Sequence, residues 1–208
     1  MKLVIATSNV GKVREFREAL AGLNLVLLSA ADAGIEAFPE ETGASYEENA
    51  LLKAGFVSLK AKLPALADDS GLEVDALSGQ PGVYSARFGG AGLSDGERTA
   101  YLLDLMAGVP RAGRGASFLA SVVLATPGGE MVTFRGECRG EVLTGPRGEG
   151  GFGYDPVFYS TELRKTFAEA TLEEKRKVSH RGRALEAFVN WALTPAGKRT
   201  MQNLVPRS

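Results

Sequence analysis

Residues 65–75 read Ala-Leu-Ala-Asp-Asp-Ser-Gly-Leu-Glu-Val-Asp, and the rest of the chain is best interpreted from here. The first three residues predict a buried strand, and Asp68-Asp69-Ser70-Gly71 predicts a turn at its end. Neighbours in an extended segment point to opposite sides, so we expect one aspartate to face a cleft and the other to tie down the loop. An Asx turn explains one aspartate but not two, because adjacent carboxylates need a cation or hydrogen bonds to compensate them. The residues alone do not choose between Asp68 and Asp69.

The segments before this stretch alternate between strand and helix patterns. Residues 2–7 predict a buried strand, and residues 25–28 form a second apolar run. Residues 11–22, between them, carry apolar side chains at helical spacing. Ser45 and Glu48 have the spacing of a capping box, which predicts a helix that ends before the next proline.

The segments after it predict one more helix and then a hairpin. Ser94 and Glu97 have the spacing of a second capping box at the start of a helix. Residues 115–125 and 130–143 predict two strands, and the Pro-Gly-Gly turn at 127–129 joins them as a hairpin.

The C-terminal third begins with a glycine-rich loop at residues 145–153. Residues 155–158 predict a short extended segment, and two helical stretches follow, the last over 179–193. Early strands alternate with helices and later strands pair as a hairpin. The pattern therefore predicts an α/β fold with a mixed sheet.

Composition indicates one compact domain. The chain has 208 residues, of which 44% are hydrophobic. This suits a single domain over residues 1–203, with two lobes around a cleft. Residues 204–208 have the sequence of a tag remnant but would equally suit a native tail, so nothing is inferred from them.

Charge and cysteine content narrow the function classes. Twenty-four Lys and Arg against 25 Asp and Glu give a net charge of −1. Without a basic excess, neither nucleic acid nor an anionic membrane is expected as a partner. Cys138 is the only cysteine, so no intrachain disulfide forms, which fits a reducing compartment. No run reaches the ~18 apolar residues of a membrane helix, so we expect a cytoplasmic protein.

The run Thr7-Ser8-Asn9-Val10-Gly11-Lys12 lies where a predicted strand meets a predicted helix. Free amides at a helix N-terminus, small polar side chains, a glycine and a lysine suit a polyphosphate. The run is not a P-loop, because Ala6 stands at the first glycine of that pattern and Val13 at its Ser/Thr. The alternative is an ordinary capped turn with a surface lysine.

The run Glu40-Glu41-Thr42-Gly43 places two carboxylates before the helix that carries Lys53. Acidic residues before a helix are commonly solvated or interact with the helix dipole. A hard divalent cation that bridges phosphates would instead need one or two such carboxylates, together with waters.

Two further segments could contact a ligand. In Gly148–Pro156, Phe152 either stacks on a base, worth about 1–3 kcal/mol, or anchors the loop in the core. Lys175–Gly182 is basic and holds His180, the only histidine. No nucleophile motif accompanies His180, and a metal site there would need several carboxylates. Recognition of an anion or carbonyl by His180 and Arg181 is the simpler hypothesis, and a solvent-facing helix start is the alternative.

Together, five ordered blocks resemble the inosine triphosphate pyrophosphatase family. They are TSNVGK, EETG with SYEENALLKA, ADDSGLEVDALSGQPGVYSAR, GGFGYDPVF and EEKRKVSHRG. The likeness runs from Lys2 to about Leu193, and its specificity lies in the order and spacing of the blocks. It implies an elongated mixed sheet flanked by helices, two lobes with the active site in the cleft between them, and a homodimer.

The resemblance also implies Mg²⁺-dependent hydrolysis of ITP, dITP and XTP between the α- and β-phosphates. The products would be the nucleoside monophosphate and pyrophosphate, which removes deaminated purines from the nucleotide pool. Asp69 would be the catalytic residue that activates water, and Glu40 and Asp69 would bind Mg²⁺. The implied substrate-binding residues are Thr7, Ser8, Asn9, Val10, Gly11, Lys12, Lys53, Ser70, Phe152, Gly153, Tyr154, Asp155, Lys175, His180 and Arg181.

Two other functions stay open at this point. One is a pyrophosphatase for other modified nucleotides, which would not need the His180 segment to read a purine. The other is a nucleotide-binding sensor that does not hydrolyse its ligand. The adjacent carboxylates argue against the sensor, because binding a polyanion gains little from extra negative charge.

Overall fold

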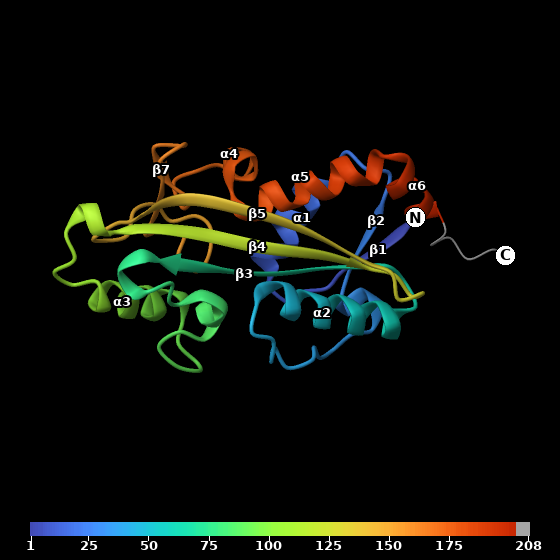
Figure 1. Cartoon of the computed structure of the whole chain (residues 1–208), viewed down its shortest axis with the longest axis horizontal. Helices are drawn as coiled ribbons and strands as arrows, with labels where there is room; N and C mark the ends of the chain where they lie inside the picture. Colours follow the sequence, from blue (N-terminus) through green and yellow to red (C-terminus); the bar gives the residue numbers. More distant parts are fainter. Residues whose placement is uncertain (203–208) are drawn as a thin grey trace.

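A seven-stranded mixed sheet runs through the protein, in a computed structural model that describes residues 1–202 (Figure 1). The strands lie in the order β2-β1-β3-β4-β5-β6-β7. Their bounds are Lys2–Ile5 (β1), Val26–Ser29 (β2), Ala65–Val74 (β3), Gly115–Ala125 (β4), Met131–Val142 (β5), Phe158–Ser160 (β6) and Lys165–Thr166 (β7). β1 pairs in parallel with β2 and β3, and the pairs from β3 to β7 are antiparallel. The predicted α/β fold with a mixed sheet is confirmed.

β1 covers only the start of β3. The two strands pair through Val4 with Ala65 and through Ile5 with Leu66, and β1 ends there. On its other side, β3 pairs with β4 along its whole length. One edge of β3 is therefore open just past Leu66, at the carboxyl end of β1. Ligands of open α/β sheets bind at such strand ends.

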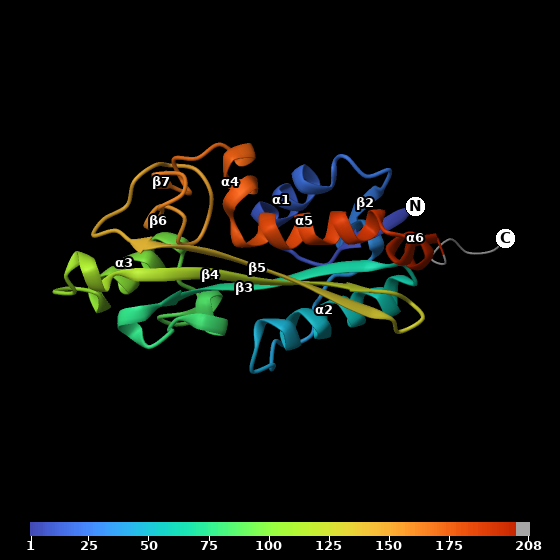
Figure 2. The same ribbon diagram turned by 45° about the horizontal axis from the view of Figure 1, so that its top comes forward.

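Helices cover both faces of the sheet (Figures 1 and 2). The α-helices are Val10–Leu20 (α1), Tyr46–Ala61 (α2), Asp95–Leu105 (α3), Leu172–Val178 (α4), His180–Leu193 (α5) and Pro195–Gln202 (α6). Short 3-10 helices are Ala31–Ala33 (η1), Asp75–Leu77 (η2), Gly82–Arg87 (η3) and Arg111–Gly113 (η4). α5 packs on β4 and β5 with α1 beside it, and α2 packs on the opposite face of β3 and β4.

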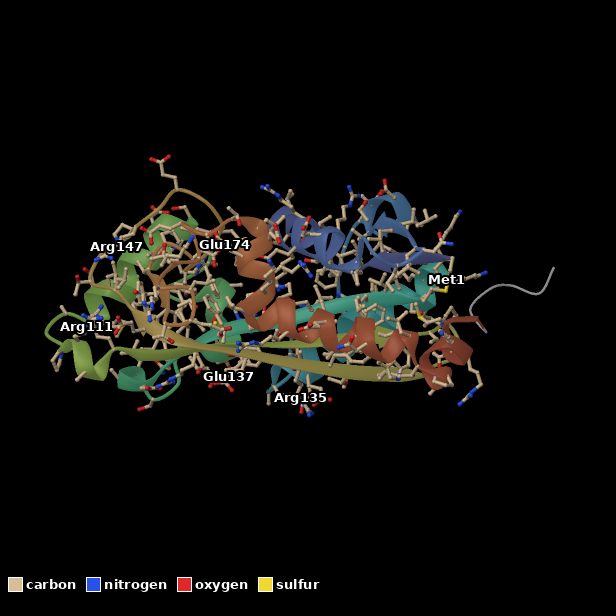
Figure 3. The ribbon with its side chains drawn as sticks, turned by 90° about the horizontal axis from the view of Figure 1, so that it is seen from above. Met1, Arg111, Arg135, Glu137, Arg147 and Glu174 are labelled. Carbon is tan, nitrogen blue, oxygen red and sulfur yellow. The ribbon has the colours of Figure 1, made fainter. Side chains whose placement is uncertain are left out.

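The long strands give the molecule its elongated shape. Seen from above, Arg111 and Arg147 lie at one end and Met1 lies near the other, with Glu174 of α4 between them (Figure 3). Of the helices within residues 1–202, none has the length and apolar character needed to cross a bilayer.

The alternation of side chains along β3 divides the core between the two faces of the sheet. Leu66 packs in one buried cluster with Phe16 of α1 and Phe188 of α5. Its neighbour Ala67 points the other way and packs in a second cluster with Val57 of α2. A third cluster fills the far end of the sheet, near α3 and β6.

The predicted turn at Asp68-Asp69-Ser70-Gly71 is wrong. These four residues lie inside β3 and pair with residues 119–122 of β4. The strand continues because β4 supplies a pairing partner throughout. The polar side chains are accommodated at the open edge of β3, where lysine and arginine side chains reach them.

The predicted extended segment 155–158 is confirmed only at Phe158, where β6 begins. Residues 153–157 form a turn instead. The amides of Val157 and Phe158 both donate to the Tyr154 carbonyl, each at 3.0 Å. These local hydrogen bonds hold the segment in a turn.

The predicted helix starts are confirmed, with one difference in their caps. Ser94 and Glu97 form a complete capping box at α3. Ser45 accepts from the Glu48 amide at 3.2 Å, but the Glu48 carboxylate accepts from the Ala44 amide at 2.7 Å instead of from Ser45. The other predicted elements agree to within about two residues, the usual uncertainty of element ends. The predicted tail, 204–208, lies outside the described residues.

We expect Phe188→Ala to lower the free energy of unfolding by about 3–5 kcal/mol, because it leaves a cavity between α5 and the sheet. Leu193→Ala at the end of the same helix is the matched control, since Leu193 is exposed. Its effect should stay within about 0.5 kcal/mol. Urea unfolding of the three proteins measures the difference, and equal losses for both variants would contradict this packing.

Candidate active site

Consecutive side chains of β3 point to opposite faces of the sheet at its open edge. Asp68 and Ser70 both contact Arg181 of α5, on one face. Asp69 contacts Asn49 and Lys53 of α2, on the other face. The expectation that the two aspartates face opposite sides is therefore confirmed.

Asp68 lies at the centre of a buried ion cluster. Its Oδ2 atom lies 2.7 Å from Lys12 Nζ and 3.0 Å from Arg181 Nη2, and it accepts from Ser70 Oγ at 3.0 Å. Burial opposes its charge, but Arg181 and Lys12 hold the pKa of Asp68 well below its ordinary value. Asp68 is therefore a compensated carboxylate that fixes the two cations.

Glu15 of α1 connects this cluster to Lys175. Glu15 accepts from Arg181 Nη1, and its Oε1 atom lies 2.7 Å from Lys175 Nζ. Lys175 Nζ also donates to Asp155 Oδ2 at 2.6 Å. Although burial opposes its charge, Arg181 and Lys175 lower the pKa of Glu15 to about 2. Glu15 was not predicted from the sequence, where the one available signal was its position three residues after Lys12, on the same side of a helix.

Asp69 is held by two side chains of α2. Its Oδ1 atom lies 3.3 Å from Lys53 Nζ, and its Oδ2 atom accepts from Asn49 Nδ2 at 3.2 Å. Burial raises the pKa of Asp69, and the Lys53 cation only partly offsets this. A buried carboxylate with a raised pKa is better matched to accepting a proton near neutral pH than an ordinary aspartate.

The acidic run before α2 contributes Glu41 to this side of the site. Glu41 Oε1 lies 2.6 Å from Lys53 Nζ, so Lys53 lies between the carboxylates of Glu41 and Asp69. Glu40, which the resemblance implies as a magnesium ligand, is exposed. Within residues 1–202, no group of three or more His, Cys, Asp or Glu side chains gathers as a metal site would.

The run from Thr7 to Lys12 joins β1 to α1. Asn9 caps the helix by accepting from the Lys12 amide at 2.9 Å, and Thr7 Oγ1 accepts from the Asn9 amide at 3.2 Å. The side chain of Lys12 is only 15% exposed and points to Asp68, so the alternative of a surface lysine is wrong. Val10 is 82% exposed and leaves the helix N-terminus accessible.

A cavity of about 120 Å³ lies beside the ion cluster that contains Lys12, Lys175 and Arg181. It is lined by Asn9, Lys12, Ser70, Gly71, Ser85, Ala86, Asp95, Arg98, Phe118, Phe152, Gly153, Tyr154, Asp155, Lys175, His180 and Arg181. Residues from four of the five sequence blocks therefore meet at one hollow, although they are far apart in the chain.

His180 is buried and stacks on Phe118, with ring centroids 4.5 Å apart and planes 8° apart. Burial, with the Arg181 cation, lowers the pKa of His180 well below its ordinary value. The imidazole is therefore neutral near pH 7, with one N–H and one lone pair. The alternative of a solvent-facing helix start is wrong, because His180 and Arg181 are both buried.

The glycine-rich loop brings Phe152 against the ion cluster. Lys175 Nζ lies 4.8 Å from the centroid of the Phe152 ring. The ring also lies against Gly11 of α1, where an added Cβ would lie 2.5 Å from Phe152 Cδ1. The loop is anchored by the Gly153 amide, which donates to Asp95 Oδ2 at 2.7 Å. Phe152 thus lies between the N-terminus of α1 and the ion cluster instead of packing in the core.

Tyr154 acts as an anchor in this structure. It is buried, and its hydroxyl donates to the Ser85 carbonyl at 3.0 Å. Ser85 Oγ in turn accepts from the Leu72 amide of β3 at 2.9 Å. Tyr154 was predicted from the sequence, whereas Ser85, Asp95, Phe118 and Asn49 were not, because their partners become neighbours only in the folded chain.

The chain is similar to known proteins over most of its length. The sequence model of the Ham1 family matches residues 3–191. A dITP/XTP pyrophosphatase of Thermus thermophilus is 55% identical over 189 residues, covering 91% of this chain and 90% of that protein. One from Deinococcus radiodurans is 51% identical over 188 residues, covering 90% and 91%.

Solved structures agree with the fold. A HAM1 protein from Coxiella burnetii superposes with a TM-score of 0.82 at 36% identity, covering 91% of this chain and 97% of that one. A nucleoside-triphosphatase, dITP/XTP pyrophosphatase, from Mycobacterium abscessus superposes with a TM-score of 0.72 at 43% identity, covering 91% and 99%.

We expect Glu15→Gln to lower the free energy of unfolding at pH 7 by about 3 kcal/mol, since the pKa of Glu15 falls from about 4.3 unfolded to about 2 folded. A lowered carboxyl pKa stabilises the fold above the unfolded pKa, and this contribution is lost as pH falls through the folded pKa. The gap to the wild type should therefore narrow below about pH 4. Urea unfolding from pH 7 to 3 tests this, with exposed Glu18→Gln as control. A gap that stays constant across this range would contradict the assignment.

Proposed function

The chain belongs to the Ham1 family and is a nucleoside triphosphate pyrophosphatase, and we propose that its substrates are deaminated purine nucleoside triphosphates. The class comprises dITP, ITP and XTP, and the products are the nucleoside monophosphate and pyrophosphate. The observation that carries the proposal is the pair Asp68 and Asp69. Asp68 pairs with two cations and has a lowered pKa, whereas Asp69 lies on the opposite face of the sheet and has a raised pKa.

The phosphates would bind at the N-terminus of α1, between its backbone amides and the Lys12 ammonium group. Helix N-terminal amides lack intrahelical acceptors and favour anions. Lys12 is held at Asp68, near the cations of Arg181 and Lys53, which supplies the local positive charge that the net charge of −1 does not. Such positioned charge stabilises the pyrophosphate leaving group.

Asp69 would take the proton from the attacking water. Its carboxylate is fixed at both oxygens, and its raised pKa suits a general base. Because Lys53 already contacts Glu41, Asp69 and the Asp68 carbonyl, its role would be to hold this side of the site. It would reach a phosphate only after leaving one of these partners.

Two carboxylates of the site, Asp69 and Glu41, would suit a magnesium ion that takes waters as its other ligands. A cation, Lys53 Nζ, already lies between the carboxylates of Asp69 and Glu41, and oxygen donors are the ligands Mg²⁺ prefers. Asp69 and Glu40 would hold the ion, with Glu41 next to Glu40 in the same run. Bound there, Mg²⁺ supplies positive charge against the phosphate oxygens.

Base selection would depend on His180. Arg181 donates to Glu15, Asp68 and Ser70, so its Nη atoms are engaged, whereas His180 is neutral and lines the cavity. An N–H of His180 can donate to the 6-oxo group of hypoxanthine or xanthine. With adenine it would face the N–H donors of the 6-amino group, and no hydrogen bond could form. Buried hydrogen bonds of this kind can reject the mismatched group by as much as ~10⁴-fold. The ring of Phe152 would stack on the base.

We propose a homodimer and a cytoplasmic location, where a nucleotide pool needs to be cleared of deaminated purines.

We expect the protein with Mg²⁺ to convert dITP, ITP and XTP to pyrophosphate and the monophosphate, and to turn over ATP far more slowly. Phosphorus NMR identifies the products, and ATP, GTP and dUTP are the comparison substrates. EDTA should abolish turnover and added Mg²⁺ should restore it. Orthophosphate as the product, or a preference for ATP or dUTP, would overturn the proposal. Binding without any product would favour the sensor.

Asp69→Asn should lower kcat for dITP by at least about 10³-fold, because the amide cannot accept the proton, while the fold and nucleotide binding stay intact. Asp104→Asn, on the exposed side of α3, is the charge-matched control and should leave kcat unchanged. Steady-state kinetics and nucleotide binding by calorimetry measure both. If Asp69→Asn kept a near-normal rate, the base would have to be another group.

A further inference from the structure

Asn49 of α2 is a fully buried polar residue in contact with Asp69. It lies four residues before Lys53, so the two side chains occupy the same side of α2 and reach the same carboxylate. The sequence blocks gave Asn49 no role beyond its place in the helix. A buried amide carries a free-energy cost unless its donor and acceptor are both used, so its partners need an explanation.

Both ends of the Asn49 amide are used, each by a different part of the site. Oδ1 accepts from the Gly43 amide at 2.8 Å, and Nδ2 donates to Asp69 Oδ2 at 3.2 Å. The orientation of the amide follows from chemistry, because a backbone N–H can only donate and the atom facing Gly43 must therefore be the oxygen. The NH₂ group is then the end that faces Asp69.

Gly43 lies too close to Asn49 for any other residue at its position. An added Cβ would lie 2.7 Å from Asn49 Oδ1 and 2.7 Å from Glu48 Cβ. Gly43 closes the acidic run that begins at Glu40, so the hydrogen bond to its amide fixes the end of that run against α2. One side chain thus touches both the acidic run and the carboxylate of β3.

Lys53 completes the arrangement from the next turn of α2. It contacts Oδ1 of Asp69 and also Glu41 of the acidic run, while Asn49 contacts Oδ2 of Asp69. The two carboxylate oxygens are therefore held by different groups from one helix. Since Lys53 is a flexible point charge and Asn49 a planar group without net charge, Asn49 is the one that can set the carboxylate plane.

We propose that Asn49 is a positioning residue that sets the orientation of the Asp69 carboxylate and fixes the acidic run 40–43 beside it. The inference rests on the proposed hydrolysis of nucleoside triphosphates. An asparagine is required because it offers a donor and an acceptor from one short planar group. Aspartate keeps an acceptor for Gly43 but offers no N–H to Asp69 and places a second carboxyl group against it, and alanine has neither donor nor acceptor. Partners that orient such carboxylates typically contribute about 10–100-fold to activity or metal affinity.

The test uses Asn49→Asp and Asn49→Ala in the full chain, with Asn24→Asp on the surface as the charge-matched control. Steady-state kinetics with dITP and Mg²⁺ give kcat and KM, and hydrogen exchange by NMR reports the Gly43 amide without substrate. We expect both variants to lose about 10–100-fold in kcat with KM within about threefold. The Gly43 amide should stay protected in Asn49→Asp and exchange fast in Asn49→Ala. The control should match the wild type.

The outcomes separate orientation of Asp69 from simple support of the loop. Wild-type kcat in Asn49→Asp would overturn the inference, since holding Gly43 would then suffice. An Asn49→Ala variant with normal kcat would also overturn the inference. The same holds for an Asn49→Ala variant whose KM rises by the same factor as its kcat falls. If Asn49→Asp does not fold, Asn49→Ala alone decides by the same criteria. A wild type that releases no pyrophosphate would overturn the proposed function and this inference together, whereas an active wild type with unaffected variants overturns this inference alone.

Discussion

The early end of β1 is the constraint on which the site depends. Because β1 pairs with only two residues of β3, the next residues of β3 lie at an open edge while β4 still holds them extended. An extended backbone sends neighbouring side chains to opposite faces. Asp68 therefore meets the cations of α1 and α5, and Asp69 meets the polar face of α2. Two adjacent carboxylates with different pKa values follow from this geometry.

The buried charges are tolerated because each is paired. Asp68, Glu15 and Asp155 alternate with Lys12, Arg181 and Lys175 in one connected network. A buried ion costs several kcal/mol unless partners compensate it, so removing one member leaves its neighbours exposed to that cost. Two cations of this network, Lys175 and Arg181, also lie over the ring of Phe152 at the cavity. Under the proposed function, stability and ligand recognition would therefore depend on the same side chains.

The sequence predicted the larger part of the fold and most of the residues that line the cavity. Strands and helices followed from apolar spacing and from caps such as Ser94 with Glu97, because these signals are local. The blocks containing Lys12, Ser70, Phe152 and His180 were recognised, and their side chains do meet at one cavity. Glu15, Asn49 and Asp95 were missed, since each looks like an ordinary helix residue until its partner from a distant segment is known. The turn at Asp68–Gly71 was wrong because a local polar signal was outweighed by pairing with β4, about 50 residues further along.

By itself, the sequence determined the element types, the mixed sheet and the chemistry of the blocks, because these depend on side-chain type and on spacing within a few residues. Only the tertiary structure decided which aspartate is compensated and which is available, since that choice depends on the cations that each face of β3 meets. It also showed that Glu41, next to Glu40, shares Lys53 with Asp69. Electrostatic interactions act through space between residues far apart in the chain, and their partners are fixed only when the sheet and helices have packed.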